Sequence, residues 1–296
     1  MAAVLLALLT ILVWSSLALL NTRVNALPPF LAVGFALCVG GLVGLVRARE
    51  WRVPARTFAV GVAGIFGYHA MLFAAFRIAP AVEVNLVNYL WPLLIVVLSP
   101  IILPGFRLGA RHVGGAALGL CGAILIATGG KLGLDLAYLP GYLLAGAAAL
   151  AWACYSLMTK RLPPFPTGAV GGFCLVSGIL SLGIYFLGQT MPGAPAMPRL
   201  QGADCLFLVL LGLGPMGGAF YSWDAALKRG DPRVIGSLSY LTPLLSTLNL
   251  VLIGGKRLTP TAGVAMALIV AGAILGSLDL FRAVLGGAVK ARQERG

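Results

Sequence analysis

The sequence predicts an all-α integral membrane protein with ten transmembrane helices in two inverted repeats of five. Three observations support this fold class. First, 60% of the 296 residues are hydrophobic and 10% are charged, whereas soluble domains contain about 25% charged residues. Second, apolar stretches long enough to cross a bilayer recur along the whole chain. Third, a polar motif that contains proline lies inside one of these stretches and returns in the second half of the chain.

Each apolar stretch has about 20 residues, which in helical form matches a hydrocarbon core of about 30 Å. The first, Met1 to Asn21, lacks the basic start of a signal peptide, so we interpret it as a spanning helix. Nine further spans are expected at residues 28–46, 56–77, 81–103, 109–129, 138–159, 166–188, 203–227, 232–253 and 259–281. The gaps between them are short, so we expect no separate soluble domain.

The two halves of the chain share short matches in the same order. Gly122-Ala-Ile-Leu125 returns as Gly272-Ala-Ile-Leu275, at an offset of 150 (272 minus 122). Five spans per half is an odd number, so the second half must enter the membrane in the opposite orientation. We therefore predict a first five-helix repeat at residues 1–133, a second at residues 134–285, and a basic cytoplasmic tail at residues 286–296.

Lysine and arginine indicate the orientation, because they accumulate in cytoplasmic loops. With the N-terminus inside, 15 of the 21 basic residues face inward, and the six that face outward are Arg23, Arg77, Lys131, Arg199, Lys256 and Arg257. We expect a multi-pass protein of the inner (plasma) membrane with both termini in the cytoplasm. The net charge of +13 does not indicate nucleic acid as a partner, because the basic residues lie in short gaps between apolar spans.

The most informative stretch is Asn85 to Leu94, which reads Asn-Leu-Val-Asn-Tyr-Leu-Trp-Pro-Leu-Leu and lies in the fourth span. Pro92 lacks the N–H that would bond the Asn88 carbonyl, and an unpaired carbonyl in lipid must face protein or a wet cavity. The pattern returns 151 residues later (243 minus 92), where Pro243 frees the Ser239 carbonyl. Inverted repeats with broken helices and polar groups at mid-depth indicate a secondary transporter. The two prolines are then hinges or, alternatively, static kinks.

These features resemble the EamA branch of the drug/metabolite transporter superfamily over nearly the whole chain. The resemblance rests on the ten spans, on Trp14 and Trp152 in the first helix of each half, and on the Tyr-Leu-X-Pro-Leu-Leu motif in the fourth helix of each half. Gly67-Tyr68-His69 and Asn88-Tyr89-Leu90-Trp91-Pro92 are similar, more narrowly, to one group of exporters within it. This resemblance implies export of aromatic and other neutral amino acids.

The charged residues also restrict the substrate class. All eight acidic residues lie in gaps or near span ends, so the mid-membrane carboxylate that an exporter of organic cations would need is not evident. Arg77 and Lys228 lie at span ends, which disfavours a strongly anionic solute. A neutral or zwitterionic solute remains, with its ammonium group near the carbonyls freed at Asn88 and Ser239. We expect export of neutral, preferentially aromatic, amino acids by alternating access, and the alternative is another neutral metabolite or drug on the same fold.

The candidate substrate-binding residues are polar and aromatic side chains expected near mid-depth. His69 could bind solute, take up a proton or pair with a neighbouring helix, so proton exchange and facilitated transport both stay open. Tryptophan and tyrosine usually lie at membrane interfaces, whereas those near mid-span could stack on a solute or pack between helices. The full set is Tyr68, His69, Asn85, Asn88, Tyr89, Trp91, Trp152, Tyr155, Ser239 and Tyr240.

Nothing in the sequence indicates a metal site or an enzyme. The five cysteines lie in or beside apolar spans without CxxC spacing, and we expect neither disulfides nor bound metal. Paired mid-depth carboxylates and an activated nucleophile are not evident either. We therefore expect no cofactor and no catalysis, and a monomer whose partners are the transported solute and the lipid bilayer.

Overall fold

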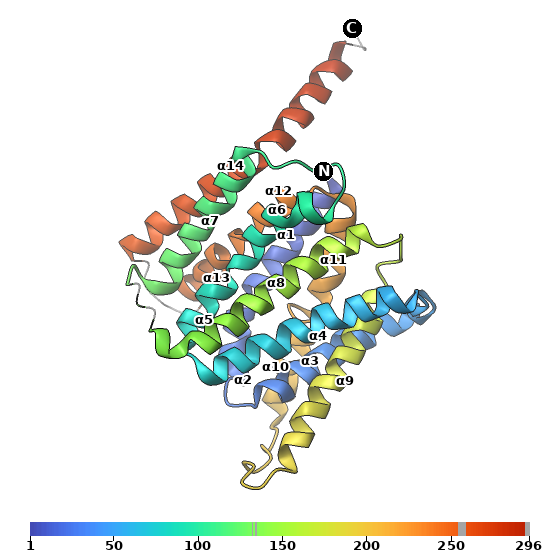
Figure 1. The fold of residues 1–296 in the computed structure, drawn as a ribbon, viewed down its shortest axis with the longest axis vertical. Helices are drawn as coiled ribbons and strands as arrows, with labels where there is room; N and C mark the ends of the chain where they lie inside the picture. Colours follow the sequence, from blue (N-terminus) through green and yellow to red (C-terminus); the bar gives the residue numbers. More distant parts are fainter. Residues whose placement is uncertain (132, 134, 254–258, 294–296) are drawn as a thin grey trace.

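The computed structural model describes residues 1–131, 133, 135–253 and 259–293, with side chains described as far as residue 278. All regular structure in these residues is helical. Ten helical stretches are long and apolar enough to cross a membrane, by length and composition. The helices lie side by side as a bundle (Figure 1). The predicted all-α membrane fold with ten spans is confirmed.

The first five spans use helices from the N-terminal half: α1 (Ala2–Ser15) with α2 (Leu17–Val24), α3 (Pro29–Val43) with η1 (Gly44–Trp51), α4 (Ala55–Ile78), α5 (Ala81–Asn88) with α6 (Leu90–Ile102), and α7 (Ala110–Thr128). The last five use η2 (Leu136–Tyr138) with α8 (Leu139–Arg161), α9 (Ala169–Gln189), α10 (Gly202–Leu213) with α11 (Gly218–Arg229), α12 (Pro232–Ser239) with α13 (Leu241–Leu252), and α14 (Pro260–Gln293).

Spans four and nine are interrupted where the repeated motif places its tyrosines. Tyr89 separates α5 from α6, and Tyr240 separates α12 from α13. Each tyrosine lies three residues before the proline of its motif, and that proline cannot donate the hydrogen bond that a continuous helix would need. The sequence pattern therefore predicted both breaks.

The eighth span, expected at residues 203–227, is found at Gly202–Arg229 but contains a break that was not predicted. The chain leaves helical geometry at Gly214 (φ −99°, ψ −112°) and at Gly217 (φ −150°, ψ −72°), so α10 and α11 are separate helices. The intervening Pro215 has no N–H, and glycine tolerates such dihedral angles because it lacks a Cβ atom. The break lets the Pro215 carbonyl accept a hydrogen bond from another span.

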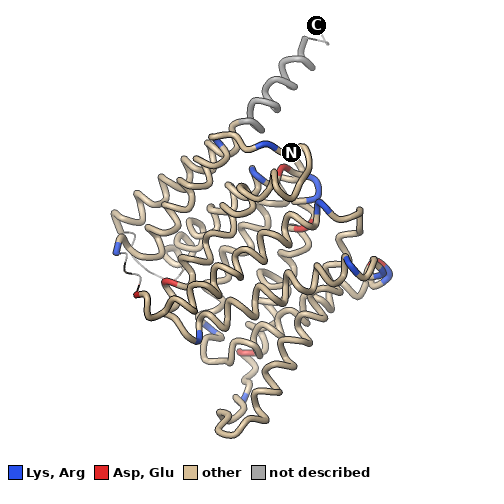
Figure 2. Tube along the Cα trace, in the orientation of Figure 1, with Lys and Arg blue, Asp and Glu red and all other residues tan. Residues whose placement is uncertain are grey.

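Helix packing divides the bundle into a closed side and an open side. At the end of the bundle that holds the N-terminus, α6 packs against α12, and both helices lie near the N label in Figure 1. We call this end the N-terminal side. Lysine and arginine residues also gather along this end of the bundle (Figure 2). Helix α14 continues to Gln293, so the predicted tail at residues 286–296 begins within a helix, and its side chains lie outside the described residues.

Candidate functional site

A cavity of about 680 Å³ lies between spans one, two, three, four, six, eight and nine. It extends from mid-depth toward the side opposite the N-terminus, because its lining includes the second helix of span one and the start of span two. Helices α5 and α13 both contribute residues to its wall. Of the predicted residues, the lining includes Tyr68, His69, Asn85, Asn88, Tyr89, Trp91, Pro92, Trp152, Ser239, Tyr240 and Pro243.

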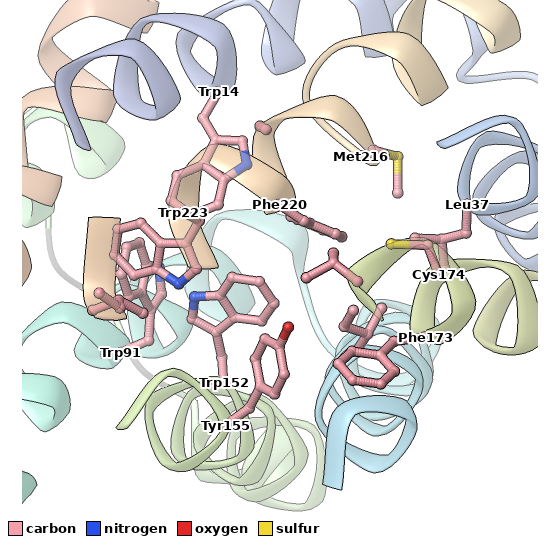
Figure 3. Close-up of a cluster of buried hydrophobic side chains, with 14 of the residues drawn as sticks. Trp14, Leu37, Trp91, Trp152, Tyr155, Phe173, Cys174, Met216, Phe220 and Trp223 are labelled. Carbon is pink, nitrogen blue, oxygen red and sulfur yellow. The ribbon is translucent and has the colours of Figure 1, made fainter. Parts of the chain in front are cut away.

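The cavity ends on an aromatic floor, which we define as Trp14, Trp91, Trp152 and Phe220. The ring centroids of Trp14 lie 5.8 Å from Trp91 and 5.9 Å from Trp152, and those of Trp152 and Phe220 lie 5.3 Å apart. Figure 3 shows these rings converging from separate helices. Edge-to-face pairs at such separations are favourable, so these contacts hold the floor together, and it offers ring faces and edges to a solute.

Trp14 is fixed by the break in span eight. Its indole Nε1 donates to the carbonyl oxygen of Pro215 at 3.0 Å. A freed carbonyl inside a membrane protein needs such a partner, and this bond satisfies one that the break exposes. The bond joins the first span to the eighth, and so holds one edge of the aromatic floor in place.

The polar groups of the cavity are amides, hydroxyls and one imidazole. The Asn88 Nδ2 donates to the Tyr68 hydroxyl at 3.2 Å. The His69 Nδ1 lies 2.7 Å from the Ile65 carbonyl, which can only accept, so Nδ1 carries the proton and Nε2 is the ring's other polar atom. Among the described lining residues there is no Asp, Glu, Lys or Arg. A solute in this cavity would therefore meet amide, hydroxyl, imidazole and aromatic groups among these residues.

Two of the predicted residues are used differently from the others. Tyr155 is not among the residues that line the cavity; its ring packs 5.4 Å from that of Trp152, between the floor and Phe173 (Figure 3). The Ser239 hydroxyl donates to the Ile235 carbonyl in its own helix at 2.8 Å. In this conformation, neither hydroxyl is directed to a solute.

Below the floor, the N-terminal side is closed by buried polar contacts. Trp223 is 1% exposed, and its Nε1 donates to the Ser156 hydroxyl at 3.0 Å. Asp224 is fully buried and pairs with Lys228 at 2.7 Å. The Lys160 Nζ donates to the Gly230 carbonyl at 2.8 Å, beyond the end of α11. The Trp223–Ser156 and Lys160–Gly230 bonds join spans six and eight beneath the cavity, whereas the Asp224–Lys228 pair lies within α11.

Asp231 starts span nine on the same side. Its carboxylate accepts from the Arg233 backbone N–H at 2.9 Å and from the Arg233 Nε at 3.0 Å. Burial by itself raises the pKa of this carboxyl, but the hydrogen bonds and charge of Arg233 outweigh burial and hold the pKa below its usual value. Asp231 therefore stays ionised at neutral pH and caps the first turn of α12.

The arrangement of spans and cavity agrees with a family comparison. The model of the EamA-like transporter family matches residues 1–128 and, a second time, residues 139–278. The chain belongs to the EamA-like transporter family. This membership confirms the family resemblance of the sequence and makes the protein a transporter with two repeats of one five-helix unit.

Curated relatives of this EamA-like transporter cover most of its length. It is 42% identical to the aromatic amino acid exporter YddG of Ancylobacter novellus, over 94% of this chain and 97% of the relative. Identity to the Escherichia coli protein of the same name is 28%, over 83% and 86% of the two chains. A solved structure that is 42% identical superposes with a TM-score of 0.87, covering 95% of this chain and 98% of its own.

Sequence reasoning missed two parts of the site. Phe220 and Trp223 were not among the candidates, although their spacing of three residues places both on one face of a helix. The Gly-Pro-Met-Gly-Gly run at residues 214–218 signalled the break that turns this face inward. Asp224 was counted as lying near a span end, yet the structure buries it completely.

Proposed function

We propose that this transporter exports neutral amino acids, with aromatic ones preferred, by alternating access. The observation that carries the proposal is the cavity itself, which has an aromatic floor and no formally charged residue in its described lining. An amino acid zwitterion has no net charge. Its binding in such a cavity therefore leaves no net charge buried without a partner. The relatives named as aromatic amino acid exporters support the same substrate class.

The proposed substrate-binding residues divide by chemistry. Trp91, Trp152 and Tyr89 offer rings to an aromatic side chain, and such ring pairs contribute about 0.5 to 1.5 kcal/mol beyond burial. Asn85 and Asn88 at the end of α5 offer amide groups to the ammonium and carboxylate of the solute. The other proposed contacts are Tyr68, His69, Ser239 and Tyr240.

The transport direction follows from the proposed orientation, with both termini in the cytoplasm. The cavity then faces the outside in this structure, and release of an exported solute is the step that it represents. Pro92 and Pro243 are the proposed hinges, since each lies beside a helix break on the cavity wall. One chain encloses the whole cavity, so a monomer suffices, and the proposal includes no catalytic step.

The test is counterflow of labelled tryptophan or phenylalanine into liposomes that contain the purified protein and unlabelled amino acid. We expect labelled amino acid to be taken up. Unlabelled aromatic amino acids added outside the liposomes should suppress this uptake, whereas glutamate and arginine added outside should leave it unchanged. Trp91→Ala should reduce uptake at least several-fold, because it removes one side of the aromatic floor.

Phe186→Ala is the matched control, since Phe186 is 48% exposed on α9 and does not line the cavity. It removes a ring of similar size without touching the site, and we expect uptake as in the unmodified protein. Uptake that prefers dianions, or that is equally reduced by both substitutions, would contradict the proposal. Uptake of other neutral metabolites or drugs in place of amino acids would support the alternative function on the same fold.

A further inference from the structure

Tyr240 contributes a hydroxyl group to a helix other than its own. The hydroxyl donates to the Tyr89 carbonyl at 3.0 Å and accepts from the Leu93 N–H at 3.2 Å. Tyr89 and Leu93 are four residues apart, so these two backbone groups would bond each other in a continuous α-helix. One side chain of span nine therefore replaces one backbone hydrogen bond of span four.

The Tyr240 ring is held tightly in this place. Its exposed fraction is 0%, and a Cβ atom added at Gly119 of α7 would lie 2.5 Å from the ring carbon Cδ2. Next to it, a Cβ atom added at Gly236 of α12 would lie 2.9 Å from the Pro92 carbonyl oxygen of α6. The hydroxyl bridge thus lies at the edge of a close contact between α6 and α12.

The two tyrosines of the repeated motif differ in this conformation. Tyr89 occupies the same motif position as Tyr240 (240 minus 89 is 151), but its hydroxyl makes no hydrogen bond to another described residue. Its side chain lines the open cavity. In an inverted-repeat transporter the two halves adopt different conformations in each state of the cycle, so a contact made by only one of two equivalent residues is expected to depend on the state.

We propose that Tyr240 is a positioning residue of the transport cycle, whose hydroxyl bridge holds α6 against α12 and keeps the N-terminal side closed. Opening that side requires α6 and α12 to separate, which breaks both hydrogen bonds of the hydroxyl. The inference rests on transport by alternating access, which is part of the proposed function, but it does not depend on which solute is carried.

Labelling of single cysteines tests this inference without a transport assay. The five native cysteines are first replaced, and one reporter cysteine is introduced at a time into protein held in lipid nanodiscs, where a soluble maleimide reaches both faces. Val96→Cys reports the closed side, because Val96 is 0% exposed on α6 and faces Gly236. Ser246→Cys reports the open cavity, whose wall it forms on α13.

Tyr240→Phe keeps the ring and removes the hydroxyl. We expect labelling at position 96 to become about tenfold faster, since two hydrogen bonds of ordinary net strength are lost from the closed side only. Labelling at position 246 should become slower as the cavity closes. Tyr185→Phe is the matched control, because Tyr185 is buried on α9 and its hydroxyl has no hydrogen-bond partner among the described residues; it should change neither rate.

Unchanged rates in Tyr240→Phe would overturn the inference, and so would faster labelling at both positions, which indicates a loosened fold. If Tyr240→Phe does not yield folded protein, Gly119→Ala displaces the ring instead, with Gly114→Ala as its control because a Cβ atom there meets only one side chain at 3.6 Å. Gly119→Ala alone should then shift the two rates in opposite directions, and any other result overturns the inference. Opposite shifts in a protein that does not carry amino acids would leave the inference standing and refute the proposed substrate class.

Discussion

The buried pair of Asp224 and Lys228 gives a sharp test of how the N-terminal side is stabilised. The Lys228 side chain is 19% exposed and that of Asp224 is 1% exposed, at an N–O distance of 2.7 Å. Replacing Asp224 by leucine leaves a largely buried ammonium group without its carboxylate. Removing one partner of a buried pair costs about 3 to 5 kcal/mol.

The surroundings of Lys228 place the expected cost at the lower end of that range. Its Nζ also donates to the Phe165 carbonyl at 2.9 Å and lies 3.4 Å from the centre of the Phe165 ring, and both contacts remain in the variant. We therefore expect a loss of about 3 kcal/mol, which lowers the unfolding midpoint of a chain of this length by about 6 °C.

Unfolding can be followed in detergent with a dye that becomes fluorescent on reaction with Cys174, which is 0% exposed in the folded protein. The control is the double variant Asp224→Leu with Lys228→Met, which replaces both charges by apolar groups of similar volume and should recover most of the midpoint. The reasoning would be refuted if the unfolding midpoint of the single variant lay within about 1 to 2 °C of that of the unmodified protein. A double variant no more stable than the single one would refute it as well.

Three further predictions concern the hinges, the end of α11 and the topology. Pro92→Leu and Pro243→Leu each restore a backbone N–H beside a helix break, and counterflow should fall while the amount of protein in the membrane stays the same; full transport would show a static kink. Lys160→Met removes the bonds to the Leu227, Lys228 and Gly230 carbonyls and should lower the unfolding midpoint by a few degrees, whereas Arg161→Met, at an exposed neighbour, should not. A reporter enzyme inserted at residues 190–201 should be active only outside the cytoplasm, and cytoplasmic activity would reverse the proposed orientation.

Much of the fold could be predicted because membrane spanning leaves a strong signal. Hydrocarbon core thickness sets span length and backbone hydrogen bonding forces helices, so all ten spans were recognisable from apolar stretches. The breaks at Tyr89 and Tyr240 were recognisable because proline removes a donor at a known position. The break at residues 214–218 was missed, since glycine is also common in tightly packed helices of membrane proteins.

The site was harder to predict than the fold, because sequence does not show which way a side chain points. Tyr155 and Trp152 are three residues apart on α8, yet only Trp152 lines the cavity. Tyr240 is among the residues that line the cavity, while its hydroxyl bonds the backbone of another span. Asp224 on α11 accepts a hydrogen bond from the Thr167 hydroxyl just before α9, a contact between segments that no local pattern relates.

Equivalent positions of the two repeats carry different side chains around the cavity. His69 of the first repeat corresponds to Phe220 of the second (220 minus 69 is 151), and Phe73 corresponds to Asp224 (224 minus 73 is 151). The first repeat therefore places an imidazole beside the cavity where the second places a ring of the aromatic floor. One turn further on, the second repeat has a buried carboxylate paired with Lys228, whereas the first has an apolar ring that lines the open cavity. The second repeat thus has a buried ion pair within α11, at positions where the first repeat has Phe73 and Arg77 (228 minus 77 is 151).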